Sequence, residues 1–320
     1  MFSSERLKGI DVFVGVAELG SFTAAAERLN LTSSAVSKSV ARLEGRLGVR
    51  LFQRTTRRLS LTEAGATFYR TCSAVLNDLE EVELTLTTEQ LEPQGRVRID
   101  LPASYGRLHV LPLILDFVEQ HPGLHPQVSF SDRFVDPALE GIDIVVRIGG
   151  SDAWAANLGH RYFGRQRLIF CASPDYLQAH GTPLSVLDLE QHRCVGYCQG
   201  DGMVGPWFFK GRQAGDMERR VMHAHIAVGD GEGEVMAALA GLGIAQLPTW
   251  LTQGHLDAGS LVEVLPQLAT DSLPMNLVWL KSRENLPKVQ ALVEYLSLRL
   301  KPSGSVRDKS GSSTVHRLER

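Results

Sequence analysis

Apolar side chains between positions 36 and 47 recur at helical intervals. They follow one another at spacings of four, three and four residues, at Val36, Val40, Leu43 and Leu47. This rhythm predicts a helix with one buried stripe. Residues 24–29 all favour helix, which predicts another short helix just before it. Because only a few residues separate the two, we expect a tight turn between them.

The residues that flank these two predicted helices suit helix ends. Either Ser21 or Thr23 can cap the first helix, and either Thr32 or Ser33 the second, since a hydroxyl oxygen accepts an unpaired N–H of the first helical turn. Asn30 can end the first helix because asparagine tolerates the left-handed backbone conformation. The segment therefore predicts a helix-turn-helix.

The side chains off the buried stripe of the second helix are short hydroxyls and cations. Hydroxyls near a helix start let the backbone approach base edges, while lysine and arginine reach phosphates or guanine. We therefore expect this helix to lie in the major groove of duplex DNA. The candidate DNA-contacting residues of the helix pair are Thr23, Ser33, Ser34, Ser37, Lys38 and Arg42.

Residues 47–62 have the pattern of a short β-hairpin. Apolar Leu51, Phe52, Leu59 and Leu61 flank a polar and cationic tip. A cationic hairpin beside a recognition helix is typical of a wing, which contacts phosphates or places arginine in a narrow minor groove. The candidate DNA-contacting residues of the tip are Arg54, Thr55, Arg57 and Arg58.

Charge is distributed unevenly along the chain. Residues 1–60 contain ten Lys and Arg against five Asp and Glu, a net charge of +5, whereas the whole chain carries −3. The other 260 residues therefore sum to −8. A basic helix face taken alone is more often solvated surface, but beside a helix-turn-helix it favours nucleic-acid binding.

A long helix with a heptad rhythm is predicted next. Its apolar residues recur at alternating spacings of four and three, at Phe68, Cys72, Val75, Leu79, Val82 and Leu86. Ser60 and Glu63 have the spacing of a capping box, and Thr62 is a second candidate cap. The stripe can pack on the downstream domain of its own chain or pair with a second copy. The apolar stripe is narrow and lies beside the predicted DNA-binding helix-turn-helix, and both features favour a dimerisation helix.

From residue 96 onward, short apolar strands alternate with helices. Strands are predicted at residues 97–101, 127–130 and 143–148, with helices through residues 111–117 and 138–142. This alternation predicts an α/β domain with a mostly parallel sheet. Ligands of such sheets bind beyond the carboxyl ends of the strands, near helix N-termini.

Polar residues at these strand ends and helix starts are candidates for binding a small-molecule effector. Ser104 and Asp230 can contact a ligand or only cap their helices. Arg147 can hold an anion in a bidentate fork or only pair with Asp143 or Glu140. Arg147 and the helix N-termini lead us to expect a carboxylate effector. The full candidate set is Ser104, Ser131, Asp132, Arg147, Asp230 and Gly231.

The sequence contains few motifs that would indicate catalysis, metal binding or a cofactor. Residues 229–233 superficially resemble a phosphate loop but lack its lysine, and no G-x-S-x-G or H-E-x-x-H motif occurs. Cys194 and Cys198 have a spacing unlike that of a zinc knuckle, so we expect ordinary buried cysteines. We therefore expect no metal, no cofactor and no enzymatic activity.

The N-terminal segment resembles the DNA-binding domain of the LysR-type transcriptional regulators. The match is dense over some 60 residues and includes residues 16–18, 20–23, 25–26, 43–44, 47–49, 51–52 and 61–65. The family usually has a Gln-Pro pair where this chain has Ser33 and Ser34. The family's base-contacting role therefore carries over more securely to Ser37 and Lys38.

The second half resembles the effector domain of the same family, which has the two-lobed fold of type 2 periplasmic solute-binding proteins. The matching phrases lie at residues 111–112, 121–122, 141–149, 171–177, 180–183, 207–208 and 240–248. The resemblance implies an α+β multi-domain chain: a winged helix-turn-helix, a long linker helix and a two-lobed α/β effector domain. We place these parts at residues 1–60, 61–92 and 96–302, with lobe I at 96–163 and 270–302 and lobe II at 164–269.

The resemblance also implies what the protein does. A regulator of this family binds double-stranded promoter or operator DNA as a homo-oligomer, here expected to be a tetramer made of two dimers. A small molecule held between the two lobes changes the shape of the assembly, and RNA polymerase is a potential partner. Because binding must favour one arrangement over another, the effector needs a differential affinity.

Two alternative functions share the two-lobed fold, a solute-binding protein and an enzyme. The sequence shows no secretory signal and no apolar run of about 18 residues, which opposes the first and leads us to expect a cytoplasmic protein without a membrane span. The missing catalytic constellation opposes the second. Residues 303–320 are rich in Ser, Gly and charge, and we expect a disordered tail.

Overall fold

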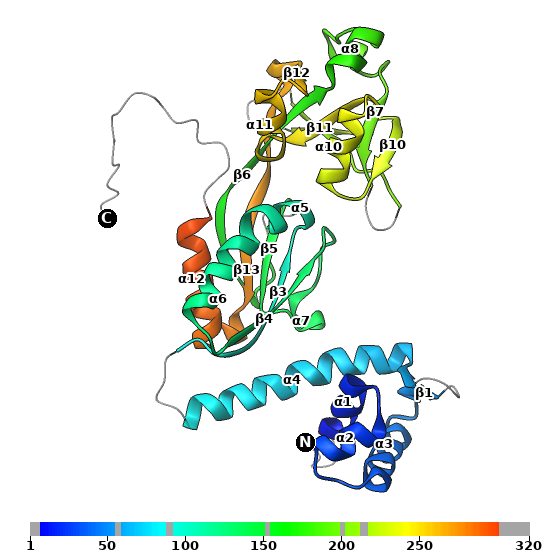
Figure 1. Cartoon of the computed structure of the whole chain (residues 1–320), viewed down its shortest axis with the longest axis vertical. Helices are drawn as coiled ribbons and strands as arrows, with labels where there is room; N and C mark the ends of the chain where they lie inside the picture. The colour runs from blue at the N-terminus through cyan, green and yellow to red at the C-terminus, as the bar shows by residue number, and fades with distance from the viewer. Residues whose placement is uncertain are drawn as a thin grey trace. The chain divides into compact units, whose positions relative to one another are not determined.

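The computed structural model describes residues 7–54, 59–87, 92–150, 154–198, 202–211 and 217–300 (Figure 1). These residues form two compact units. The N-terminal unit contains the residues up to Gly95 together with Val135–Ile142, and the C-terminal unit contains the others from Arg96 onward. The predicted disordered tail, residues 303–320, lies outside the described residues.

The N-terminal unit begins with three short helices, α1 (Ile10–Leu19), α2 (Phe22–Arg28) and α3 (Ser33–Leu47). Of the candidate caps, Ser21 accepts the N–H of Ala24 at 3.3 Å, and Thr32 accepts the N–H of Ala35 at 3.2 Å. Asn30 has a φ of 52° in the turn between α2 and α3. The predicted helix-turn-helix is confirmed.

The three helices share one apolar core. Phe13 of α1 is fully buried at its centre, and its ring lies 5.4 Å from the rings of both Phe52 and Phe68. The stripe predicted on α3 packs into this core through Val36, Val40 and Leu43. Its fourth member, Leu47, is 38% exposed, so that part of the prediction is wrong. Leu47 is the last residue of α3, and the left-handed Gly48 ends the helix directly after it.

The predicted hairpin follows α3. Strand β1 (Phe52–Arg54) pairs antiparallel with β2 (Leu59–Leu61), with Phe52 opposite Leu61. Of the candidate caps for the next helix, α4 (Glu63–Thr87), Thr62 is the one used, because its hydroxyl accepts the N–H of Gly65 at 2.9 Å. Ser60 lies inside β2, so it does not form the predicted capping box.

The heptad stripe of α4 has two different environments. Phe68 and Cys72 pack against the core of the helix-turn-helix. Val75 and Leu79, one and two turns further on, are 42% and 46% exposed. The first half of the stripe therefore stabilises the helix-turn-helix, and the next two members are left at the surface. The side chains of Val82 and Leu86 lie outside the described part.

The C-terminal unit is built on one sheet in the order β10-β7-β11-β6-β13-β5-β3-β4, with β12 also paired to β6. The strands are β3 (Gly95–Leu101), β4 (Leu124–Phe130), β5 (Ile144–Ile148), β6 (Leu158–Ala172), β7 (Cys194–Tyr197), β10 (Ala224–Val228), β11 (Ile244–Pro248), β12 (Val262–Val264) and β13 (Thr270–Leu280). A separate hairpin joins β8 (Trp207–Lys210) to β9 (Met217–Arg220). We call the part built by β3, β4 and β5 lobe I, and the part built by β7, β10 and β11 lobe II.

Helices flank the strands in both lobes. Lobe I has α5 (Ala103–Tyr105), the π-helix η1 (Gly106–Val110), α6 (Leu111–Gln120) and α12 (Pro287–Arg299), with the 3-10 turn η3 (Lys281–Arg283) before α12. Lobe II has α8 (Pro174–His180), α9 (Val186–Leu189), α10 (Gly231–Leu239), α11 (Thr249–Asp257) and the 3-10 turn η2 (Pro266–Leu268). The short helix α7 (Pro137–Glu140) belongs to the segment grouped with the N-terminal unit.

Two long strands join the lobes. β6 pairs with β13 from Leu158 to Leu168, and its last residues pair with β11 and β12 in lobe II. Figure 1 shows β6 and β13 running side by side between the lobes. Both are antiparallel to each other and to their other neighbours, whereas β3–β5, β7–β10 and β7–β11 are parallel. The sheet is therefore mixed, and the prediction of a mostly parallel sheet is wrong.

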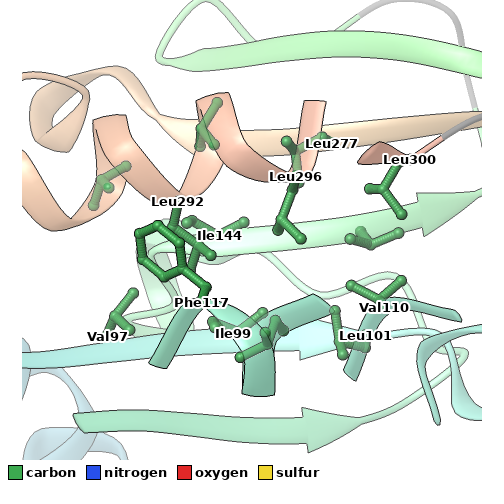
Figure 2. Packing of buried hydrophobic residues seen from close by; sticks show 14 of the residues in the cluster. Val97, Ile99, Leu101, Val110, Phe117, Ile144, Leu277, Leu292, Leu296 and Leu300 are labelled. Atoms are coloured by element: carbon green, nitrogen blue, oxygen red, sulfur yellow. The ribbon is translucent and has the colours of Figure 1, made fainter. Parts of the chain in front are cut away.

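Each lobe has its own core. In lobe I, α6 and α12 cover the sheet, and Phe117 and Leu292 meet over Ile99 and Ile144 (Figure 2). In lobe II, one cluster forms around Phe170 and the rings of Trp207 and Phe209, and another around Val235 and Leu247. These cores fix the strand ends and helix starts on which the candidate effector residues lie.

Candidate functional site

Helix α3 presents a polar and cationic face to solvent. Ser34, Lys38 and Arg42 are exposed and follow one another at intervals of four, so they lie along one side of the helix. The buried residues Val36 and Val40 lie on the opposite side. Packing in the core therefore leaves this face outward, as a helix in the major groove requires.

The other candidates of the helix pair adjoin that face. Ser33 is exposed in the first turn of α3, and Ser37 follows it one turn later, half-buried. Thr23 is exposed in the first turn of α2. Two neighbouring helices thus carry the six candidates predicted from the sequence.

The wing is attached to α3 by hydrogen bonds. The Glu44 carboxylate accepts the N–H groups of Leu51 at 2.7 Å and Phe52 at 3.1 Å, where β1 begins. From the other strand, the Thr62 hydroxyl donates to the carbonyl of Arg50 at 2.7 Å. The backbone of Arg54 ends β1, while its side chain and the predicted tip residues Thr55, Arg57 and Arg58 lie outside the described part.

In the C-terminal unit, Ser104 of lobe I is bonded to the start of α10 in lobe II. Its Oγ accepts the N–H of Glu232 at 3.2 Å. The candidate Gly231 lies at the same point, and a Cβ there would come within 3.0 Å of Leu251. Capping its own helix was one of two roles suggested for Ser104; that alternative is wrong, because Ser104 lies inside α5, whose N-cap is Pro102.

A second link between the lobes is an ion-pair cluster. Arg107 of η1 pairs with Glu232 and lies 3.7 Å from Asp230. Asp230 also caps α10, because its carboxylate accepts the N–H of Gly233 at 2.7 Å. Asp230 therefore both starts a helix and faces a cation of the other lobe.

Asp132 lies in the loop after β4 and contacts both lobes. Its carboxylate accepts the N–H of Ala103 at 3.0 Å and is hydrogen-bonded to Tyr197 at the end of β7. Burial and the nearby carboxylates, including Asp132, raise the pKa of the Tyr197 hydroxyl, so it stays protonated. Tyr197 is thus a hydrogen-bond donor under ordinary conditions.

Arg147 is engaged inside lobe I. Its guanidinium donates to the Asp100 carboxylate at 3.2 Å and to the carbonyl of Ser131 at 3.3 Å. Both side chains of the pair are at least 95% buried. Burial raises the pKa of Asp100 and lowers that of Arg147, against the mutual attraction of the two charges. The pairing partner is therefore Asp100, and the suggested Asp143 pairs instead with Arg283.

The carboxyl of Glu234 lies deeper in the same region. The residue is 5% exposed, and its carboxyl has no hydrogen bond or ion pair among the described residues, although its backbone N–H donates to the carbonyl of Asp230. Burial raises its pKa well above the ordinary value for glutamate, and Asp230 and Asp132 raise it further. The three carboxyls are thus close enough to repel one another.

Residues 7–66 match the family model for bacterial regulatory helix-turn-helix proteins of the lysR family, and residues 90–300 match the LysR substrate binding domain. The chain belongs to the LysR family. It is a DNA-binding transcriptional regulator with a helix-turn-helix domain and a domain for a small-molecule effector.

Relatives and solved structures agree with this assignment. The HTH-type transcriptional regulator CrgA of Neisseria meningitidis serogroup C is 34% identical over 289 residues, which are 90% of this chain and 94% of CrgA. An uncharacterized HTH-type transcriptional regulator of Haemophilus influenzae is 34% identical over 283 residues, 88% of this chain and 96% of that relative. The relatives are named as transcriptional regulators rather than enzymes.

Two full-length structures share the fold. The structure of CrgA, a LysR-type transcriptional regulator from Neisseria meningitidis, superposes with a TM-score of 0.57 at 30% identity and covers 94% of this chain and 99% of that one. The Vibrio cholerae virulence activator AphB gives a TM-score of 0.58 at 25% identity, covering 90% of this chain and 97% of that one. The predicted fold, with its winged helix-turn-helix, linker helix and two-lobed effector domain, is thereby confirmed.

The cysteines of this LysR-type regulator were predicted to be ordinary buried residues. Burial raises the pKa of Cys194 to about 11, so its thiol is protonated, as expected for an ordinary buried cysteine. Cys198 is only half-buried, which corrects the same expectation for that residue. Across the described ranges, no group of three or more His, Cys, Asp and Glu residues is placed to hold a metal ion. Nor does any helix within them have the length and apolar character needed to cross a membrane.

Sequence reasoning missed several residues of the region between the lobes. Arg107, Tyr197, Glu232 and Glu234 were not among the candidates, although they contact or face those that were. His109 was also missed, and its buried Nε2 has no hydrogen-bond partner among the described residues. The signal available was position: Arg107 follows Ser104 by three residues, and Glu232 and Glu234 fall in the first turn of the helix that Asp230 begins.

Proposed function

We propose that this LysR-type regulator reads operator DNA with the outward face of α3 and with its wing. The exposed side chains of Ser34, Lys38 and Arg42 on one side of α3 support this, with Ser33 and Ser37 beside them. Hydroxyl and cationic groups are the ones that meet base edges and phosphates in the major groove. Thr23 and the wing residues Arg54, Thr55, Arg57 and Arg58 would complete the surface through backbone phosphates.

We further propose that α4 joins two copies and that two such dimers form a tetramer. Val75 and Leu79 support this, because they continue the heptad of α4 beyond the residues that pack on the helix-turn-helix. Such leucine and valine side chains, spaced for a coiled coil, are suited to a second copy of the same helix. The domain ranges remain those proposed from the sequence, with the linker helix at residues 61–92 between the two functional parts.

The effector is proposed to bind between lobes I and II. The supporting observation is that Ser104, Asp132 and Asp230 take part in contacts that cross between the lobes. Gly231 adjoins Ser104, whereas Ser131 and Arg147 are bonded to each other within lobe I. A ligand there would replace some of these contacts and so change the relative free energy of lobe arrangements. That change would alter how the helix-turn-helix domains of the oligomer bind DNA.

A carboxylate effector has less support from these contacts than from the sequence. The Arg147 guanidinium is paired with Asp100, and the first N–H groups of α10 are bonded to Ser104 and Asp230. The groups expected to hold an anion are therefore already occupied by the protein.

We propose a cytoplasmic location, no enzymatic activity and, where the regulator activates, contact with RNA polymerase. These follow from a DNA-binding regulator that must reach the chromosome. The solute-binding and enzymatic alternatives would not require a helix-turn-helix.

A gel-shift titration tests the proposal. The full chain should bind DNA from upstream of its own gene at least about a thousand times more tightly than random duplex of equal length. Affinity should fall steeply as salt rises, because phosphate contacts release counterions. Equal affinity for both duplexes would exclude sequence-specific regulation through that DNA.

The oligomer is tested by replacing Val75 and Leu79 with aspartate. The double variant should lose the dimer in light scattering, while Leu47→Asp, which changes an exposed leucine of α3 in the same unit, should keep it. An unchanged mass for the double variant would exclude α4 as the dimer contact.

A further inference from the structure

The side chains that meet between lobes I and II carry more negative than positive charge. Four carboxyls lie there, one on Asp132 and three at the start of α10 on Asp230, Glu232 and Glu234. One cation, Arg107, pairs with Glu232 and lies 3.7 Å from Asp230. Asp132 also interacts electrostatically with Arg107 and with Arg147 of lobe I. The charges that act on Glu234 are those of Asp230 and Asp132, both negative.

Glu234 differs from the other three in how it is held. Its side chain is buried, 5% exposed, whereas Glu232 is 40% exposed and paired. Among the described residues the carboxyl of Glu234 has neither a hydrogen bond nor an ion pair, although carboxylates in proteins are rarely buried alone. The position in the first turn of α10 favours a negative charge, but burial outweighs it. An acid group in this setting is complementary to a cation that the protein itself does not supply.

Groups that could receive an anion at the same place are already used. Ser104 accepts the N–H of Glu232, and Asp230 accepts that of Gly233, so the start of α10 is occupied. Arg147 is bonded to Asp100 within lobe I. An incoming carboxylate would thus meet four carboxyl groups and no open cation among these residues.

We propose that the effector of this regulator carries a positively charged nitrogen, as an ammonium or amidinium group, and that Glu234 is its counter-charge. Asp132 and Asp230 add to the attraction. The proposal rests on the effector-binding function proposed above and specifies its ligand class. A bare metal ion is a poorer match, because no group of three or more candidate ligands is placed together in the described ranges. An organic cation needs only directed N–H donation to one or two carboxylates.

Proton exchange should accompany this binding. Burial and the neighbouring Asp230 and Asp132 favour the protonated form of Glu234 when the site is empty. A bound cation favours the ionised form, so binding should release a proton. Affinity for the cation should therefore increase as pH rises, until Glu234 is ionised without the ligand.

The test uses probes that share a scaffold and differ in charge. Full-length protein is titrated by calorimetry with benzylamine, benzyl alcohol and benzoate, and with putrescine, butanediol and succinate. At least one amine should bind more tightly than its alcohol and its acid by about tenfold or more. Heats measured in buffers of different ionisation enthalpy should show proton release for that amine. If neither amine exceeds its two counterparts, the proposal is overturned.

The residue assignment is tested on Glu234→Gln, which keeps the side chain's size and removes its charge. The amine's advantage should fall by about tenfold or more, and the proton release should disappear. Glu119→Gln, an exposed glutamate of α6, is the matched control and should leave both unchanged. Near-UV circular dichroism of the Glu234→Gln variant checks that it is folded. A folded variant that retains the full amine preference would overturn the role of Glu234.

The same preparations separate this proposal from the proposed function. Gel shifts on the upstream DNA are run without ligand, for both the unaltered chain and the variant. Specific DNA binding together with a preference for acids or alcohols would overturn only the ligand class. Loss of specific DNA binding in the unaltered chain would instead overturn the regulator's proposed operator function.

Discussion

The carboxylate of Glu44 accepts the backbone N–H of Leu51 at 2.7 Å. The same oxygen accepts the N–H of Phe52 at 3.1 Å. Glu44 lies on α3, and the two amides lie where the chain enters β1, so one side chain joins α3 to the β1–β2 hairpin. The position of the wing relative to α3 is therefore set by a charge-assisted contact as well as by the apolar core.

Replacing Glu44 with alanine should destabilise the N-terminal unit and weaken DNA binding. Two backbone N–H groups would lose their acceptor, at a cost of about 1 to 3 kcal/mol. Glu44→Gln retains an acceptor oxygen and should cost less. Thermal unfolding and a gel shift measure the two effects. Alanine and glutamine variants with equal unfolding temperatures and affinities would contradict the positioning role.

Lys38→Ala should reduce affinity for operator and random duplex alike if Lys38 contacts a phosphate. The salt dependence of log K should then become shallower by about one. If Lys38 instead reads guanine, specificity at one base pair should relax while the salt dependence changes less. Lys210→Ala, an exposed lysine on β8, is the control and should leave binding unchanged. No effect of Lys38→Ala on either quantity would remove it from the DNA surface.

Glu234→Gln should stabilise the ligand-free protein at high pH. The folded pKa of Glu234 is raised by burial and by Asp230 and Asp132, while Tyr197 and Cys171 also face it. A raised folded pKa means that stability is present below the ordinary glutamate pKa and is lost as pH rises through the folded pKa. Glutamine lacks this loss.

The variant should accordingly melt a few degrees above the unaltered protein at about pH 8, and the difference should shrink towards about pH 5. Thermal unfolding across this range measures it. Glu119→Gln should give a difference that does not depend on pH in this way. A lower melting temperature for Glu234→Gln at high pH would contradict an unpaired buried carboxyl.

Arg147→Met should destabilise lobe I by about 3 to 5 kcal/mol, because it leaves the Asp100 carboxylate buried without its partner. Adding Asp100→Asn should recover part of that loss, since the unpaired charge is then removed. Denaturant unfolding of the single and double variants forms the cycle. Additive effects would show that the two side chains are not coupled.

Thiol labelling should distinguish Cys198 from the other cysteines. Burial raises the pKa of Cys72 to about 11, of Cys194 to about 11 and of Cys171 to about 12, so these thiols stay protonated at about pH 8. Half-buried Cys198 should react fastest with Ellman's reagent. Cys198→Ser should remove the fast phase, and a fast phase that persists would contradict the assignment.

Periodicity predicted the helix-turn-helix, the hairpin and α4 because these elements are local. The stripe at Val36, Val40 and Leu43 needs only neighbouring turns to become buried. Leu47 fits the apolar spacing but is exposed, because the helix ends at Gly48. Apolar spacing alone does not predict where a helix ends. Phe68 and Cys72 fit a heptad, which predicted contact with a second copy. They instead pack with residues of α1 and β1 in a core of the same chain.

The region between the lobes was only half predictable. Strand ends and helix starts identified Ser104, Asp132 and Asp230, because each is placed by its own element. Their partners come from the other lobe, more than 100 positions away for the bond from Ser104 to Glu232. No local pattern encodes such a pairing. For the same reason, the sequence suggested the nearby Asp143 as the partner of Arg147, whereas the partner is Asp100 on the adjacent strand β3.

The pairing of β6 with β13 also limits how the lobes can move. The two strands are hydrogen-bonded to each other from Leu158 to Leu168, so sliding one lobe along the other would break a row of backbone bonds at once. Bending the ribbon keeps those bonds, and the register shifts next to Leu273 and Met275 are the places where such a ribbon already departs from regular geometry. A rotation of one lobe about this pair of strands therefore costs fewer backbone hydrogen bonds than a slide of one strand past the other.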